Sequence, residues 1–143
     1  MARYLLDTNV VSYLADTTSP FHASAHGRLA ALADGDEVAL SVLSLFELHH
    51  WFAYRPADRQ VVEELVRDFV VLPVPVAGAE RFGSMMRGLR GGLSRREVQR
   101  HALDGMIAVT ALERDATLVS NDALFARLAV LDPALRVIDW TSG

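Results

Sequence analysis

Short apolar runs alternate with longer segments of helical periodicity along this chain of 143 residues. The runs are short enough for buried strands, which the pattern predicts at residues 3–6, 38–42, 70–74, 117–120 and 135–138. Apolar residues at helical spacing predict helices at residues 10–15, 22–33, 44–53, 56–69, 76–89 and 122–129, and one or two helices between 94 and 114. Strands and helices therefore alternate through the whole chain.

Capping and breaking residues support these boundaries. Asp7 or Asn9 can cap the first helix, and Gly35 is placed to end the second. A serine followed three residues later by glutamate, the capping-box pattern, occurs twice, at Ser44 with Glu47 and at Ser94 with Glu97. Pro73 cannot donate a backbone hydrogen bond, so the third strand is expected at an edge of the sheet.

Strands separated by helices favour an α/β fold with a parallel sheet covered on both faces, because right-handed crossovers place helices there. Ligands of such sheets bind beyond the carboxyl ends of the strands, where the strand order reverses. We expect one domain over residues 1–143, since neither an internal repeat nor a linker interrupts the pattern.

Composition narrows the chemistry. The chain is 51% hydrophobic and 22% charged, without an apolar run long enough to span a bilayer or a signal-peptide pattern, so no membrane association and a cytoplasmic location are expected. Cysteine is absent, which excludes disulfides and thiolate catalysis. All 14 basic residues are arginine, which excludes a lysine Schiff base and a lysine-dependent phosphate loop.

Four acidic residues follow, or lie just beyond, the apolar runs: Asp7, Glu47, Asp104 and Asp122. With strand order 3-2-1-4-5, Asp7 and Asp122 would follow neighbouring strands, with Glu47 and Asp104 on adjacent helices. Gathered carboxylates repel one another, so such a cluster normally persists because a hard cation neutralises it. Oxygen ligands of this kind suit Mg²⁺ or Mn²⁺.

Each acid also has an ordinary structural interpretation. Asp7 and Asp122 can each cap a helix, and the capping box by itself accounts for Glu47. Asp104 lies within a small apolar stretch, where a carboxylate facing the core would be costly unless paired or coordinated. It can instead lie on the solvated face of its helix.

Charge and aromatic residues leave two interpretations open. The formal net charge is -4, yet five arginines are concentrated in one stretch, Arg87, Arg90, Arg95, Arg96 and Arg100. They can flank a cleft for a polyanion or form a solvated helix face. The aromatic cluster Trp51, Phe52 and Tyr54 can stack on bases, or belong to the core or a partner contact.

The combination of motifs resembles the PIN-domain ribonucleases, particularly the VapC-type toxins of toxin-antitoxin pairs, over the whole chain. The resemblance is carried by Leu6-Asp7-Thr8-Asn9, Ser41-x-x-Ser44-x-x-Glu47-Leu48, Leu103-Asp104-x-x-Ile107-Ala108-x-x-Ala111 and Thr117-Leu118-Val119-Ser120-Asn121-Asp122-x-x-Phe125. It implies a flavodoxin-like sheet in a three-layer sandwich and a Mg²⁺- or Mn²⁺-dependent endoribonuclease. It also implies a VapB-type antitoxin as partner, RNA as substrate, and a homodimer.

The resemblance implies an acidic site in which Asp7, Asp104 and Asp122 bind metal and Glu47 binds metal or orients the attacking water. Thr8, Asn9 and Ser120 are expected to position carboxylates or phosphate.

Three residues depart from the family pattern. Ser44 and Ser120 stand where threonine is frequent, and Leu124 stands where many relatives carry another acid. The loss of that acid puts a second metal ion in doubt, and favours as the alternative a catalytically weak RNA-binding or scaffold domain.

Overall fold

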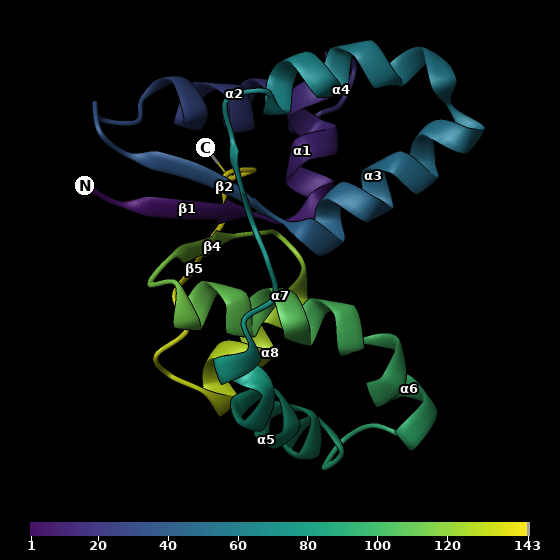
Figure 1. The fold of residues 1–143 in the computed structure, drawn as a ribbon, viewed down its shortest axis with the longest axis vertical. Coiled ribbons are helices and arrows are strands. Elements are labelled where there is room, and N and C mark those ends of the chain that lie inside the picture. Colours follow the sequence, from purple (N-terminus) through teal and green to yellow (C-terminus); the bar gives the residue numbers. More distant parts are fainter. Residues whose placement is uncertain (143) are drawn as a thin grey trace.

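The computed structural model describes residues 1–142 and contains a five-stranded parallel sheet (Figure 1). Its strands are β1 (Arg3–Leu6), β2 (Glu37–Ser41), β3 (Val70–Leu72), β4 (Thr117–Val119) and β5 (Val137–Ile138). Their order across the sheet is β3-β2-β1-β4-β5. The predicted fold class and strand order are confirmed, with β3 at an edge.

Helices connect consecutive strands. They are α1 (Thr8–Ala15), α2 (His22–Ala30), α3 (Val42–Tyr54), α4 (Arg59–Val66), α5 (Ala79–Leu89), α6 (Arg95–Arg100), α7 (Ala102–Glu113) and α8 (Ala123–Leu131). Short 3₁₀ turns precede two of them, at η1 (Pro56–Asp58) and η2 (Val76–Gly78). None of the helices within residues 1–142 is both long and apolar enough to cross a bilayer.

The sheet separates two hydrophobic cores, because consecutive side chains of a strand point to opposite faces. Leu5 packs with residues of α5, α6, α7 and α8, while its neighbour Leu6 packs with residues of α1, α2, α3 and α4. Figure 1 shows the resulting layers, with α1 to α4 above the sheet and α5 to α8 below it. The strand order reverses between β1 and β4, so this is where the two layers diverge.

Several predicted boundaries are wrong: β5 begins at Val137 rather than at residue 135, and α4 ends at Val66 rather than at residue 69. Helix α3 begins at Val42 rather than at Ser44, because the Ser41 hydroxyl already accepts a hydrogen bond from the Leu43 N–H at 3.1 Å. Helix α2 ends at Ala30, and Gly35 (φ 88°) lies in the turn that follows instead of capping it. The Asp36 carboxylate holds that turn by accepting from the N–H groups of Ala33 and Ala2.

Proline and capping explain other boundaries. β3 ends at Leu72, immediately before Pro73, as expected for an edge strand interrupted by proline. The helical stretch predicted between 94 and 114 is two helices, joined at His101. The Ser94 hydroxyl caps α6 by accepting from the Glu97 N–H at 3.2 Å, so this serine is a helix cap as predicted.

Candidate acidic site

The four predicted acids extend from the carboxyl edge of the sheet or from helices beside it. Asp7 directly follows β1 and caps α1, and Asp122 follows β4 and caps α8. Glu47 lies in the second turn of α3, one turn later than expected, because α3 begins earlier. Asp104 lies in the first turn of α7. Each layer of helices thus contributes two of the four carboxylates.

Asp7 is the buried member, with 5% of its surface exposed. Its Oδ1 accepts a hydrogen bond from the Thr8 N–H at 2.8 Å, and its Oδ2 accepts from the Ser120 hydroxyl at 3.0 Å. The Asp7 N–H donates to the Val119 carbonyl at 3.0 Å, which ties the end of β1 to β4. The carboxylate is therefore fixed from both sides of the point where the strand order reverses.

Burial raises the pKa of Asp7 from 3.8 to about 6, against the opposing effect of the Ser120 and Thr8 hydrogen bonds. The negative charges of Asp104 and Asp122 raise this pKa further. The helix-cap interpretation of Asp7 is confirmed, but it leaves unexplained why a cap should be buried beside two further acids. A cap on an exposed turn would do the same for the helix without the desolvation.

Glu47 is held by the side chain of Thr8, the first residue of α1. The Thr8 hydroxyl oxygen lies 3.3 Å from Glu47 Oε1 and 2.8 Å from the Ser44 hydroxyl oxygen. A hydroxyl has one proton and an ionised carboxylate can only accept, so the arrangement favours donation from Thr8 to Glu47. Desolvation raises the pKa of Glu47 although its side chain reaches solvent, and the charge of Asp7 raises it further.

Asp104 is half-buried at the start of α7. Desolvation raises its pKa, and the charges of Asp122 and Glu47 add to the increase. His101 Nδ1 lies 3.9 Å from Asp104 Oδ2, and this neighbour lowers the pKa of Asp104 against the larger increases. Asp104 is thus neither fully solvated nor neutralised by a strong ion pair.

The close packing of α7 on α5 fixes where Asp104 lies. A Cβ on Gly105 would be 2.5 Å from the Met86 Cε atom and 3.0 Å from a ring carbon of Phe82. Only glycine therefore allows this approach without movement of the facing side chains. The glycine next to Asp104 consequently has a packing role and need not bind a ligand.

Asp122 is exposed, and its Oδ1 accepts from the Leu124 N–H at 2.9 Å, so its helix-cap interpretation is also confirmed. Ser120 links it to Asp7, because the Ser120 hydroxyl accepts from the Asp122 N–H at 3.0 Å while donating to Asp7. Beside Asp122, a cavity of about 470 Å³ opens between α8 and β5. Asn9 is exposed on the first turn of α1.

The four carboxylates share an electrostatic environment, but their side chains do not enclose an ion. Within residues 1–142, no three Asp, Glu or His side chains approach closely enough to form a metal cluster. The donor set itself fits a hard cation, since it consists of carboxylate oxygens that repel one another and lack a basic partner of comparable strength. We conclude that the chemistry of the donors suits Mg²⁺ or Mn²⁺, and that the assignment of each ligand stays a prediction.

Two residues acquire a meaning that the sequence pattern did not give. Ser44, interpreted as a helix cap, is fully buried in the first turn of α3 and contacts Thr8. The Ser41-x-x-Ser44 spacing was the available signal, because one helix start uses one serine as its cap and Ser41 is the one used. Leu124 is buried in the core formed with α5 and α7, so the position of the family's additional acid contributes to packing here.

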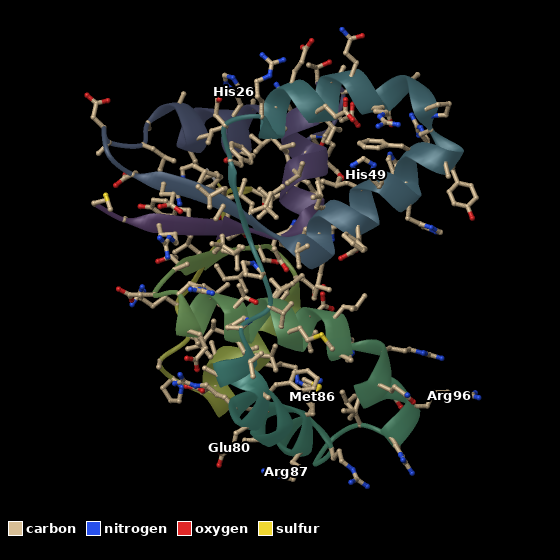
Figure 2. The ribbon with its side chains drawn as sticks, in the orientation of Figure 1. His26, His49, Glu80, Met86, Arg87 and Arg96 are labelled. Atoms are coloured by element: carbon tan, nitrogen blue, oxygen red, sulfur yellow. The ribbon has the colours of Figure 1, made fainter. Side chains whose placement is uncertain are left out.

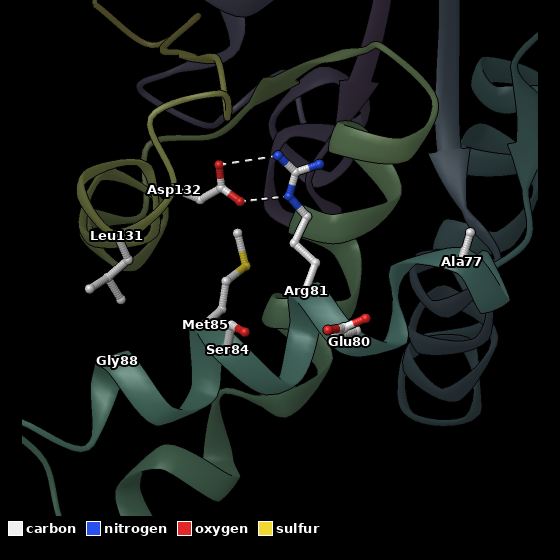
Figure 3. Close-up of a pocket in the computed structure, with 8 residues that line it drawn as sticks. All are labelled: Ala77, Glu80, Arg81, Ser84, Met85, Gly88, Leu131 and Asp132. Atoms are coloured by element: carbon white, nitrogen blue, oxygen red, sulfur yellow. Dashed lines mark hydrogen bonds and ion pairs between the residues drawn. The ribbon is translucent and has the colours of Figure 1, made fainter.

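A second hollow lies away from the acids, between α5 and α8, with a volume of about 610 Å³. Figure 3 shows Arg81 at its centre, with its guanidinium 2.6 Å from Asp132 Oδ2. Asp132 and Asp122 cap opposite ends of α8, which separates them by about 15 Å along the helix. This hollow contains a structural ion pair and belongs to a different part of the molecule from the acidic site.

The molecule is thus a parallel α/β sheet with acidic side chains along the edge where the strand order reverses. The PIN domain family matches residues 4–131, and this chain belongs to that family. A search of curated proteins finds no match.

Solved structures with the same fold come from toxin-antitoxin complexes. The chain is similar to one in VapBC2 from Rickettsia felis bound to a DNA fragment from their promoter, at 22% identity and a TM-score of 0.76, covering 96% of this chain and 98% of that one. It is also similar to one in VapBC-1 from nontypeable Haemophilus influenzae, at 20% identity and a TM-score of 0.72, covering 98% and 99%. A third similar chain is in DNA-bound VapBC from Salmonella typhimurium, at 23% identity and a TM-score of 0.71, covering 98% of this chain and 99% of that one. These likenesses extend over nearly the whole of each chain.

Proposed function

We propose that residues 1–143 form a metal-dependent endoribonuclease domain that acts as the toxin of a type II toxin-antitoxin pair. The observation that carries the proposal is the buried Asp7 carboxylate, whose pKa is raised by burial and by the charges of Asp104 and Asp122. A protein rarely maintains such repulsion unless a cation or substrate relieves it. The PIN family and the toxin-antitoxin complexes of similar fold support the same reaction class.

The residues have distinct proposed roles. Asp7, Asp104 and Asp122 would hold Mg²⁺ or Mn²⁺, which when bound supplies a water of lowered pKa and offsets the charge of a phosphodiester. Ser120 and the Thr8 N–H fix the Asp7 carboxylate, so its oxygens keep one orientation. Thr8 contacts Glu47, which would accept a proton from the attacking water or bind metal. Asn9, exposed beside Thr8, would contact the phosphate.

The test compares RNA cleavage by purified protein with Mn²⁺, with Mg²⁺ and with excess chelator. Cleavage that requires either ion and disappears in Asp7→Asn supports the proposal. Asp34→Asn, a change of the same charge at an exposed position away from the acidic edge, serves as the matched control. Cleavage retained by Asp7→Asn would indicate a contaminating nuclease.

An antitoxin would be the expected partner, by analogy with the VapBC complexes. Phe46 and Trp51 are 71% and 46% exposed on α3, next to Glu47, and offer apolar anchors for an amphipathic helix. Phe52, which the sequence grouped with them, is 7% exposed and belongs to the core. An arginine carried by such a segment would neutralise the acidic edge. A homodimer is proposed by the same analogy.

A specific observation favours the second candidate, a PIN-like RNA-binding domain with weak turnover. Leu124 is 6% exposed and fills core volume where many relatives carry an acid, so this chain has one fewer ligand for a metal. RNA binding without ion-dependent cleavage in the experiment above would support this alternative.

A further inference from the structure

Five of the chain's arginines lie between residues 87 and 100. The ion pairs within residues 1–142 involve arginines elsewhere, at Arg3, Arg55, Arg59, Arg81 and Arg136. Arg87, Arg90, Arg95, Arg96 and Arg100 are all exposed, and none of them is in an ion pair in the part of the chain that the structure describes. Glu97 is the single acid among them.

The tertiary structure adds a sixth arginine that the sequence places far away. Arg127, on α8, has its Nη2 atom 3.5 Å from the position that a Cβ on Gly92 would occupy. We call Arg87, Arg90, Arg95, Arg96, Arg100 and Arg127 the arginine arm. Figure 2 shows Arg87 and Arg96 projecting from α5 and α6 away from the body of the protein.

Buried apolar residues hold this segment in place. Val98, 7% exposed, anchors α6 in the lower core, and Leu93 packs against the same core from the preceding turn. Ser94 caps α6, which fixes where the helix begins. The arginines are thus presented on an ordered backbone, which lowers the entropic cost of binding a partner.

The arm begins at the acidic site. Arg100 is the last residue of α6, His101 joins α6 to α7, and Asp104 follows in the first turn of α7. A nucleic acid whose phosphate is held at the acids would therefore meet the first arginine of the arm, Arg100, about one helical turn from Asp104. The acids repel a polyanion, and the arm supplies the attraction that the net charge of -4 does not.

We propose that the arginine arm binds the RNA backbone on one side of the scissile phosphate, an inference that rests on the nuclease function proposed above. Guanidinium groups match phosphate oxygens with two parallel donors, and arginine is the chain's only strong cation. An acidic polypeptide is a weaker fit, because protein partners need apolar anchors. Within residues 1–142, none of the large exposed apolar side chains lies between residues 87 and 100, and those nearest to Arg127 in sequence are Val130 and Leu131 at the end of α8.

The experiment measures binding without cleavage. A fluorescein-labelled 15-nucleotide oligouridine is titrated with protein in excess chelator at several salt concentrations, and the slope of log affinity against log salt is determined. Arg95→Gln/Arg96→Gln/Arg100→Gln removes three contacts, so the slope should become shallower by about 2. The affinity advantage of wild type over this variant should then shrink about 20-fold between 50 and 200 mM salt.

The matched control is Arg28→Gln/Arg67→Gln/Arg114→Gln, which removes the same charge from exposed arginines outside the arm. This control should keep the wild-type slope. Arg87→Gln/Arg127→Gln, on α5 and α8, provides a second test that leaves α6 intact and should reduce the slope by about 1.4. Oligoadenosine should lose affinity to the same degree, since backbone contacts do not read bases.

Equal loss in the control and arm variants would mean that total charge alone matters, and would overturn the proposal. A 15-residue polyglutamate that competes with RNA at lower concentration than unlabelled oligouridine would overturn it in favour of an acidic protein partner. Binding through the arm without ion-dependent cleavage leaves this inference standing and removes the nuclease. Ion-dependent cleavage, together with arm variants that keep the wild-type salt slope, would support the nuclease and overturn the role of the arginine arm.

Discussion

The acidic edge is flanked by two surfaces of opposite character. On α3 and α4, exposed Phe46, Trp51, Tyr54 and Val61 form an apolar face beside Glu47, and the arginines near them are paired, Arg55 with Asp58 and Arg59 with Glu63. The arginine arm, beside Asp104, carries unpaired cations. One layer of helices is therefore suited to a protein partner and the other to a polyanion, while both contribute acids to the same site.

The difference between the two surfaces shows that the pairing of charged side chains says more about possible partners than the net charge does. The chain as a whole is acidic, and an average over it argues against nucleic acid. Beside the apolar face the fold pairs Arg55 and Arg59 with acids, whereas the ion pairs within residues 1–142 include none of the arginines of the arm. Under the functions proposed above, inhibition and substrate binding would use separate surfaces that meet at the carboxylates.

The largest expected effect comes from removing one acid from each layer. Asp7→Asn and Asp104→Asn should each reduce kcat/KM for RNA cleavage by about 10³-fold or more, equivalent to about 4 kcal/mol of transition-state stabilisation. The effects should be far from additive in the double variant, because both residues act on one site. Initial rates with Mn²⁺ measure this, and a fully active Asp104→Asn would mean that the lower layer contributes no essential carboxylate.

Acidic repulsion should make the metal-free protein less stable as the pH rises. The folded protein keeps the Asp7 proton up to a pH of about 6, whereas the unfolded chain loses it near 3.8, so the folded state binds more protons in between. The free energy of unfolding should fall by up to about 3 kcal/mol from Asp7 between pH 4 and pH 7. The raised pKa values of Glu47 and Asp104 act in the same direction.

Urea denaturation in chelator at each pH measures this dependence. Asp7→Asn should flatten it, and Mn²⁺ should raise the stability of wild type at pH 7 far more than at pH 4. Stability that instead increases from pH 4 to pH 7 would show that the acids are neutralised by other groups in the folded protein.

The apolar face can be tested separately from the arm. Phe46→Ser, at a side chain that is 71% exposed, should weaken binding of an antitoxin by about 30-fold, the cost of an interface hot spot of about 2 kcal/mol, with no loss of fold stability. The arm variant Arg95→Gln/Arg96→Gln/Arg100→Gln should leave antitoxin affinity within about twofold. Isothermal titration with the proposed VapB-type antitoxin provides the measurement, and the reverse ranking of the two variants would exchange the proposed roles of the surfaces.

The smallest effect concerns the packing that positions Asp104. Gly105→Ala introduces a Cβ at 2.5 Å from Met86 and should reduce the free energy of unfolding by about 1 to 2 kcal/mol, because the flexible methionine yields and Phe82 yields less. Gly27→Ala, with open space around it on α2, is the control and should be neutral or slightly stabilising. Thermal denaturation compares the two, and an unaffected Gly105→Ala would show that α5 and α7 approach less tightly than the structure indicates.

Much of the fold followed from local pattern. Alternation of apolar runs with helical periodicity predicts a parallel α/β sheet, since buried parallel strands need little polar character and crossovers need helices. Proline after Leu72 marks the edge strand, and Ser94 marks the start of α6. The boundary of α3 was wrong because two serines three residues apart both fit a helix cap, and only backbone geometry shows that Ser41 is the one used.

From the amino-acid sequence alone came the candidate side chains: four acids after apolar runs, hydroxyls beside them, and arginine as the only strong cation. Tertiary structure alone decided that Ser120 holds Asp7, that Thr8 contacts both Ser44 and Glu47, and that Arg127 joins arginines some thirty residues earlier. Local pattern records propensity and periodicity, whereas contacts between distant residues depend on strand order and helix packing, which arise only when the whole chain buries its apolar surface.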